Sequence, residues 1–141
     1  REKVYCSNVE YDYIRDLLMR DPAVWEKFKY MYTVKKFHNY RFTLSRIADE
    51  FKKEYIQRIS QEFKRAREKD ELKPNLFSSK EWENLMFLIK DPDGYYVKYY
   101  LQSARERSLE KKVNDLEKST SLKVGRAIMF IPIKIKKLFK H

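Results

Sequence analysis

The chain has 141 residues, a formal net charge of +11 and a pI of about 9.6, and 43% of its residues are hydrophobic. This length and apolar content allow a buried core, so the high charge does not indicate disorder. Two glycines and four prolines are too few for a sheet with many tight turns. The single cysteine, Cys6, excludes an internal disulfide and a cysteine-rich zinc site. We therefore expect an all-α protein, an irregular helical bundle, with an anionic partner such as lipid headgroups, nucleic acid or a sugar phosphate.

Two helices are predicted in the first 42 residues. Asn8 is expected to cap a short helix over residues 10–19. Asp21 and Pro22 indicate a second helix start, because aspartate caps an N-terminus and proline fits the first turn. This helix is expected to reach about His38 and to bend at residues 39–42, unless it runs through them. The side chains expected to face inward are Tyr13, Leu17, Leu18, Trp25, Phe28 and Tyr32.

Three more helices are predicted before residue 120. The first covers residues 43–69 and ends in a linker around Pro74. Ser78 and Glu81 have the spacing of a capping box that starts a helix reaching about Ile89. Residues 91–94 are expected to form a turn before a long C-terminal helix over residues 95–119. The core residues expected here are Ile47, Phe51, Ile59, Trp82, Leu85 and Ile89. Residues 1–119 are thus predicted to be one helical accessory domain, a piece of a longer chain.

The second half of the predicted C-terminal helix is highly charged. Its apolar residues Leu109, Val113 and Leu116 match alternating d and a positions of a heptad repeat. Two heptads are too short to define a coiled coil. They still allow a projecting helix that pairs with a second copy, so a homo-oligomer is one expected partnership.

Residues 120–141 form a predicted basic amphipathic tail. They hold six Lys or Arg residues and no Asp or Glu, which is +6 of the net charge of +11. A helix from Pro132 places four apolar residues on one face and lysines across from them. Such a segment suits attachment to an anionic membrane surface, although it could instead dock on its own domain. The candidate membrane-surface residues are Lys123, Arg126, Ile131, Lys134, Ile135, Lys136, Lys137, Leu138, Phe139 and Lys140.

Other motifs point to chemistry only weakly. Asp91 and Asp93 have the spacing of a divalent-metal motif, but Pro92 and Gly94 between and beside them are typical of a turn. The two histidines are far apart in sequence, and His38 is expected to interact with a helix end. We predict no catalytic residue, no metal site and no cofactor in this chain.

Tyrosines and basic residues give two further candidates for ligand binding. Four tyrosines beside Lys98 could form a stacking platform, although helical spacing favours two that pack inward and two that stay at the surface. A group of basic residues near the predicted bend could form a patch, although such runs are usually a solvated face. These tyrosines are Tyr95, Tyr96, Tyr99 and Tyr100, and the basic residues are Lys35, Lys36, Arg41 and Arg46.

Two stretches resemble the C-terminal portion of bacterial family 2 glycosyltransferases, whose catalytic domain has the GT-A fold. The first, residues 25–63, contains YTVKKF at residues 32–37 and RIADEF at residues 46–51. The second, residues 116–138, contains LEKSTSLKVGR at residues 116–126, followed by Pro132 and the lysine-rich residues 134–137. The GT-A sheet, its metal-binding Asp-x-Asp motif and its catalytic base have no counterpart here, so no catalytic residue of the family can be assigned.

The resemblance implies a non-catalytic C-terminal domain of an enzyme that builds a cell-surface polysaccharide. Nucleotide sugar and divalent metal would bind only to the catalytic domain of the parent enzyme. The expected partners are that domain and an anionic membrane surface, and the expected location is cytoplasmic, peripheral to the inner face of the plasma membrane. The charge and tyrosines leave two alternatives open: a basic helical module that binds nucleic acid, and a protein-interaction module.

Overall fold

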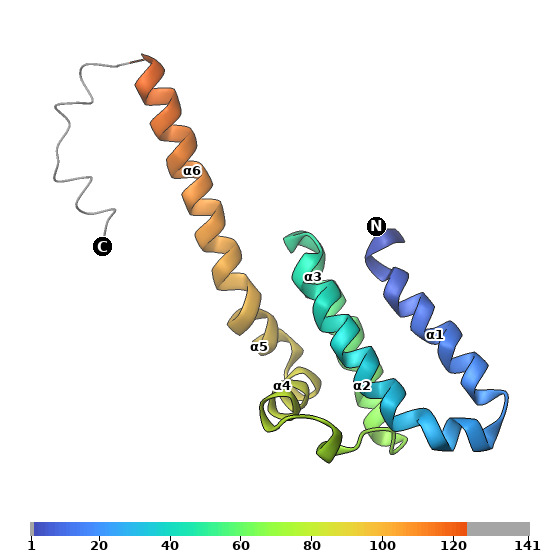
Figure 1. Cartoon of the computed structure of the whole chain (residues 1–141). Coiled ribbons are helices and arrows are strands. Elements are labelled where there is room, and N and C mark those ends of the chain that lie inside the picture. The colour runs from blue at the N-terminus through green and yellow to red at the C-terminus, as the bar shows by residue number, and fades with distance from the viewer. Residues whose placement is uncertain (1, 124–141) are drawn as a thin grey trace. The chain divides into compact units, whose positions relative to one another are not determined.

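The computed structural model describes residues 2–123 of the chain, and side chains from Lys3 to Ser119 (Figure 1). Residues 2–123 contain helices and no strand, which confirms the predicted all-α fold. The chain divides into two compact units, one that ends at Leu101 and one that begins at Gln102. The predicted domain boundary after residue 119 stays a prediction.

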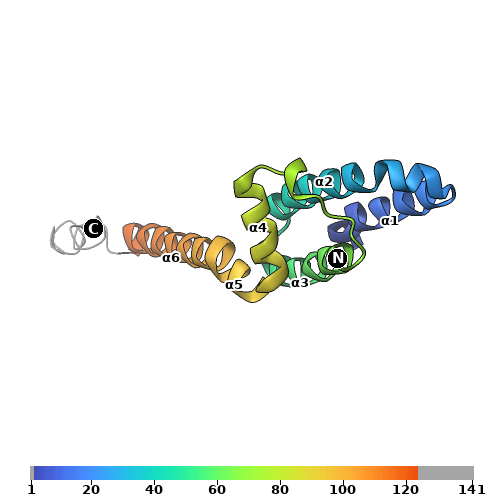
Figure 2. The ribbon, with the colours of Figure 1, turned by 90° about the horizontal axis from the view of Figure 1, so that it is seen from below.

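The first unit is built from four longer helices and several short ones. Helices α1, α2 and α3 lie side by side, and α4 runs at a steep angle to α2 and α3 (Figures 1 and 2). The short π-helix η3 follows α5 directly. The bounds are η1 (Glu2–Tyr5), α1 (Cys6–Met19), α2 (Pro22–Arg46), α3 (Asp49–Glu68), η2 (Pro74–Leu76), α4 (Ser79–Lys90), α5 (Pro92–Tyr96) and η3 (Val97–Leu101).

The helix starts follow the capping rules that the sequence indicates. The Asp21 side chain accepts a hydrogen bond from the backbone N–H of Ala23, and Pro22 occupies the first position of α2. Before α4, Ser78 and Glu81 form the predicted capping box, in which each side chain bonds the other residue's backbone N–H. Both signals are confirmed because they depend on local geometry alone.

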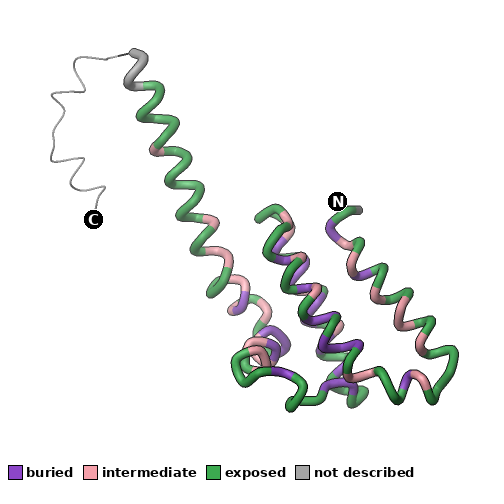
Figure 3. Tube along the Cα trace, viewed as in Figure 1, coloured by how far each residue is buried: buried purple, intermediate pink, exposed green. Residues whose placement is uncertain are grey.

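The core lies along α2, α3 and α4 (Figure 3). Rings pack edge to face through its centre, where Phe37 contacts both Phe63 and Phe77 and Tyr40 contacts Phe63. Of the predicted core residues, five are buried: Trp25, Tyr32, Ile59, Leu85 and Ile89. Three others are half-buried and pack against the core: Ile47, Phe51 and Trp82.

Several predictions about the first two helices are wrong. Tyr13 and Leu17 of α1 and Phe28 of α2 are exposed, whereas Leu18, which is also expected to face inward, is half-buried. Helix α1 packs on α2 through Tyr11, which lies on a different face from Tyr13 and Leu17. Asn8 is not a cap but a fully buried residue within α1, which begins at Cys6. The Asn8–Glu62 and Arg15–Glu71 contacts hold this helix in place together with the Tyr11 ring, which packs against aromatic rings of α2.

Two helix boundaries also differ from the prediction. Helix α2 runs through residues 39–42, which confirms the second of the two possibilities given for them and extends the helix past His38, because Tyr40 and Leu44 continue its buried stripe. The break comes instead at Ile47 and Ala48, whose backbones are extended. Residues 91–94 are not a free turn: Asp91 caps α5 and Pro92 is its first residue.

The second unit contains the long helix α6 (Gln102–Lys123), which confirms the predicted long C-terminal helix. Its heptad residues Leu109 and Leu116 are 61% and 63% exposed, and Val113 is half-buried. Within the described part of α6, these residues form an apolar stripe that is largely exposed.

Candidate functional site

The predicted membrane-surface residues fall outside what the structure describes. Residues 124–141 are not described, and Lys123 is known only as the last residue of α6. The predicted basic amphipathic tail therefore stays a prediction. Among residues 2–123, none of the helices combines the length and apolar character needed to cross a bilayer.

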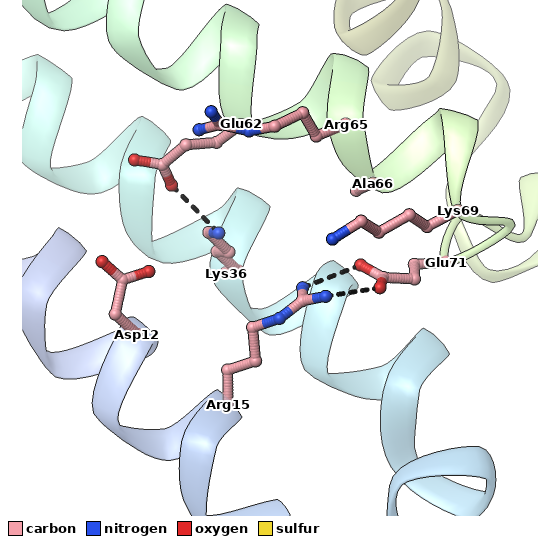
Figure 4. A pocket seen from close by; sticks show the side chains of 8 residues that line it. All are labelled: Asp12, Arg15, Lys36, Glu62, Arg65, Ala66, Lys69 and Glu71. Atoms are coloured by element: carbon pink, nitrogen blue, oxygen red, sulfur yellow. Dashed lines mark hydrogen bonds and ion pairs between the residues drawn. The ribbon is translucent and has the colours of Figure 1, made fainter. Parts of the chain in front are cut away.

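A polar hollow of about 140 Å³ lies among α1, α2, α3 and the segment after α3 (Figure 4). Charged side chains of both signs line it, and two ion pairs hold most of them. The lining residues are Asp12, Arg15, Lys36, Glu62, Arg65, Ala66, Lys69 and Glu71. The sequence pattern predicts no joint site for them, since Lys36 is expected in a surface patch and Arg65 and Lys69 at the basic end of a helix.

Glu62 is the centre of the first charged cluster. The Lys36 ammonium lies 2.9 Å from its Oε2, and the Tyr40 hydroxyl donates to the same oxygen at 2.8 Å. Its Oε1 accepts from the Asn8 amide at 3.0 Å and from Nε of Arg58 at 3.3 Å. Every acceptor direction of this nearly buried carboxylate is thus used by a donor from another position on α1, α2 or α3.

These contacts decide the protonation state of Glu62. Burial alone raises the pKa of this carboxyl group, but the Lys36 charge and the hydrogen bonds from Lys36, Tyr40 and Asn8 outweigh burial, and the pKa is lowered. Burial and the neighbouring Glu62 carboxylate raise the pKa of Tyr40, so its phenol stays protonated and keeps donating. The cluster is therefore a fixed arrangement of charges near neutral pH, unlike an acid or base poised to exchange protons.

The second cluster pairs Arg15 of α1 with Glu71. Two parallel hydrogen bonds of 2.7 and 2.9 Å join the guanidinium to the carboxylate. This hydrogen-bonded contact with Glu71 raises the pKa of Arg15. The exposed fraction of the Glu71 side chain is only 4%, so the pair is largely removed from water.

A helix-end motif positions Glu71. Asp70 has a φ of 56°, the left-handed conformation, directly after α3. The N–H of Glu71 bonds the Ala66 carbonyl at 2.9 Å, and the N–H of Asp70 bonds the Arg67 carbonyl at 3.2 Å. These two bonds form a Schellman motif, which ends the helix and reverses the chain toward α1.

The charged groups of the hollow stabilise the packing of the helices around it. Its buried cations and anions neutralise each other, and only Asp12, Arg65 and Lys69 at its rim are exposed. Neither a serine, a cysteine nor a histidine lines it. We assign the hollow to holding α1 against α2 and α3.

The side chains of the histidine and Asp-x-Asp candidates contact other residues of the first unit. The expectation that His38 lies at the end of its own helix is wrong, because α2 continues to Arg46. Its Nε2 lies 2.9 Å from Oε1 of Glu81, in the capping box at the start of α4. Asp91 accepts from the N–H of Gly94, and Asp93 accepts from the Gln57 amide at 2.7 Å. Within the described residues, no group of three or more His, Cys, Asp or Glu side chains is placed to hold a metal ion.

The candidate basic patch does not exist as predicted. Lys36 points into the bundle and pairs with Glu62, whereas Lys35, Arg41 and Arg46 are exposed. Among the four tyrosines, Tyr95 is buried, Tyr96 and Tyr100 are half-buried and Tyr99 is exposed. The structure does bring one residue of each candidate group together, since Arg41 and Tyr99 line the same groove.

Comparison with protein-family models, with curated sequences and with solved structures gives no match to this chain.

Proposed function

We propose that this chain is the non-catalytic C-terminal domain of a bacterial family 2 glycosyltransferase that assembles a cell-surface polysaccharide. Its role is to hold the enzyme at the anionic cytoplasmic face of the plasma membrane and to support self-association. The resemblance of residues 25–63 and 116–138 to such extensions supports the family. The helical architecture of residues 2–123 is compatible with an accessory role.

The observation that carries the proposal is the charge distribution at the C-terminal end. Residues 120–141 hold six cations without one acid, whereas residues 102–119, which lead into them, carry a net charge of only +1 from five cations and four acids. Each Lys or Arg near an anionic surface contributes roughly 1 kcal/mol of attraction. Apolar side chains among the lysines add insertion into the headgroup region. The combination fits a surface anchor better than a nucleic-acid contact, which has no use for Ile131, Ile135, Leu138 and Phe139.

Co-sedimentation with vesicles tests the anchor. We expect the full chain to sediment with vesicles that contain phosphatidylglycerol and not with vesicles of phosphatidylcholine alone, and the binding to weaken as salt rises. Leu138→Glu should reduce binding, and so should the combined Lys134→Gln, Lys136→Gln and Lys137→Gln changes.

The matched control replaces three exposed lysines of the first unit, Lys27→Gln, Lys53→Gln and Lys64→Gln, and removes the same charge. It should bind vesicles nearly as well as the wild type. No wild-type binding, together with a lower melting temperature for Leu138→Glu, would show that the tail docks on its own domain. Equal losses in both lysine variants would show unspecific attraction and would contradict the anchor.

The exposed apolar stripe on α6 supports the self-association role. A second copy that pairs along this stripe would bury Leu109 and Leu116, which are both more than half exposed. Sedimentation equilibrium is expected to give a concentration-dependent mass that falls to the monomer value in Leu109→Glu/Leu116→Glu. A wild-type chain that stays monomeric at high concentration would remove this part of the proposal.

A further inference from the structure

A second groove is lined by residues of α2, α4 and η3. Its volume is about 470 Å³, within the range of sites that hold small organic ligands. Basic, aromatic and amide side chains line it together. They are Arg41, Lys80, Asn84, Phe87, Lys98 and Tyr99.

The groove is positively charged. It contains three cations, Arg41, Lys80 and Lys98, and one acid, Glu83. All four of these residues are exposed. Within the described residues, none of the three cations forms an ion pair with a carboxylate. The polar hollow of Figure 4 differs in this respect, because there the buried charges neutralise each other. The cations of the groove remain available to an anionic ligand.

Aromatic rings lie directly beside these cations. The Lys98 ammonium is 5.2 Å from the ring centre of Tyr99 and 5.5 Å from that of Phe87. The two rings are 6.3 Å apart at 61°. Tyr99 is 39% exposed, so its ring offers a surface to a second flat ring. A ligand that stacks on Tyr99 would bring an attached anionic group within reach of Lys98.

Asn84 adds a fixed polar group to the wall of the groove. Its Oδ1 accepts a hydrogen bond of 2.9 Å from the hydroxyl of the buried Tyr95. Burial raises the pKa of Tyr95, so this phenol remains a donor at neutral pH. With its oxygen engaged, Asn84 has its amide NH₂ to donate, and the Glu83 carboxylate beside it can accept.

The helix that carries Lys98 and Tyr99 is itself unusual. Residues 97–101 form one turn of π-helix, a rare geometry that occurs often at functional sites. The extra residue in such a turn shifts the side chains around the helix axis relative to an α-helix. In this chain the shifted turn carries both an ammonium group and an aromatic ring of the groove.

We propose that the groove binds a nucleotide unit, meaning a phosphate group joined through a sugar to a flat base. The base stacks on Tyr99, the phosphate contacts Arg41, Lys80 and Lys98, and Asn84 and Glu83 offer a donor and an acceptor to the base or sugar. A neutral saccharide would leave the three cations unused, and inorganic phosphate would leave the ring unused. The source of the unit is a free mononucleotide or a single-stranded oligonucleotide.

Calorimetric titration of the full chain tests the proposal with four probes. These are adenosine monophosphate, adenosine, inorganic phosphate and a 5′-phosphorylated single-stranded hexanucleotide. Adenosine monophosphate or the hexanucleotide should bind more tightly than adenosine or phosphate. Tyr99→Ala should weaken that binding between about 5-fold and 150-fold, the usual range for loss of one base-stacking ring. Combined Arg41→Gln, Lys80→Gln and Lys98→Gln changes should weaken it by at least about tenfold, because hydrogen bonds to charged groups are lost.

Matched controls separate the groove from general attraction to the basic chain. Tyr13→Ala removes another exposed tyrosine, and Lys27→Gln/Lys53→Gln/Lys64→Gln removes three exposed lysines elsewhere. Both controls should bind within about twofold of the wild type, and melting temperatures should confirm that all variants fold. Binding of the monophosphate supports a free nucleotide as the source, and binding of the hexanucleotide alone supports a strand. The proposal is overturned if neither binds, if phosphate binds as tightly as the nucleotide, or if the controls lose as much affinity as the groove variants.

Discussion

Replacement of Lys36 by methionine tests whether the charges around Glu62 stabilise the bundle. Methionine keeps the unbranched, apolar part of the lysine side chain, so the substitution removes mainly the ammonium group. The side chains of Lys36 and Glu62 are 9% and 8% exposed, so water cannot readily replace the lost partner. The variant therefore keeps a carboxylate in a place where burial opposes its charge.

The expected loss is about 3 kcal/mol of unfolding free energy at pH 7. Removing one partner of a buried ion pair usually costs about 3–5 kcal/mol. We take the lower end because Tyr40, Asn8 and Arg58 still donate to Glu62. The matched control is Lys52→Met. Lys52 is 5% exposed, but the side chain of its partner Asp49 is 44% exposed and stays solvated when the ammonium is removed. Lys52→Met should lower the unfolding free energy by only about 1 kcal/mol.

The cost of Lys36→Met should depend on pH in a defined direction. The folded-state pKa of Glu62 lies below its ordinary value of 4.5, so in the wild type this group contributes stability above pH 4.5. That contribution is lost as the pH falls through the lowered folded-state pKa. In Lys36→Met the main cause of the lowering is gone, and burial shifts the pKa of Glu62 upward. The variant therefore carries a penalty at pH 7 that disappears once Glu62 is protonated, and the difference from the wild type narrows in acid.

Urea unfolding followed by tryptophan fluorescence is the assay, because Trp25 and Trp82 both lie in the first unit. Unfolding free energies of wild type, Lys36→Met and Lys52→Met would be compared at pH 7 and at pH 3. A Lys36→Met cost that stays the same at both pH values would refute the assignment to the Glu62 charge. Equal costs for the two lysine variants at pH 7 would refute the role given to burial.

Two local predictions concern the ends of helices. Ser78→Ala should lower the unfolding free energy by about 1 kcal/mol in the same urea assay, because the capping box before α4 is lost, and Ser79→Ala one position later should have little effect. Asp70→Gly should raise the unfolding free energy by about 0.5–1 kcal/mol, because glycine adopts the left-handed conformation without the steric cost of a side chain. Lys69→Gly, at a residue with negative φ, should lower the unfolding free energy. An unchanged unfolding free energy in Ser78→Ala would contradict the stabilising role of the capping box. A lower unfolding free energy in Asp70→Gly would contradict the steric cost assigned to the left-handed Asp70.

Sequence reasoning succeeded for this fold where a local signal was sufficient. The caps at Asp21 and Ser78 involve residues within a few positions of each other, and both are found as predicted. The break at Ile47 and Ala48 has no such signal, because neither glycine nor proline marks it. The sequence alone leaves a bend at residues 39–42 open, since nothing in it shows that Tyr40 and Leu44 are buried on one continuous helix.

The polar hollow could not have been predicted from the sequence. Glu62 contacts Asn8 and Lys36 across 54 and 26 positions, and such pairs become neighbours only when three helices pack. On a helical wheel, Lys36 and Glu62 look like two of many surface charges in a chain that is 38% charged. The groove lined by α2, α4 and η3 could not have been predicted either. Arg41, Lys98 and Tyr99 are each noticeable in the sequence, but their common location depends on how α4 crosses α2.

The way α1 is held explains why its face was mispredicted. The residue it buries is Asn8, and its contacts include the Arg15–Glu71 pair, the Asn8–Glu62 bond and a bond from the Tyr32 hydroxyl to the Tyr11 carbonyl. Each of these requires a specific partner at hydrogen-bond distance, whereas apolar contacts tolerate a shift along or around a helix. Polar contacts therefore fix the register of α1 on α2 and α3 more strictly than leucines would. Its apolar residues Ile14 and Leu18 then lie with Phe28 and Met31 around a separate apolar groove of about 260 Å³. Among the apolar residues of α1, Tyr11 packs against the core, Ile14 and Leu18 line this groove, and Tyr13 and Leu17 are exposed. The apolar residues of α1 therefore do not share one inward face, and the rule that apolar faces point inward does not identify the buried face of this helix.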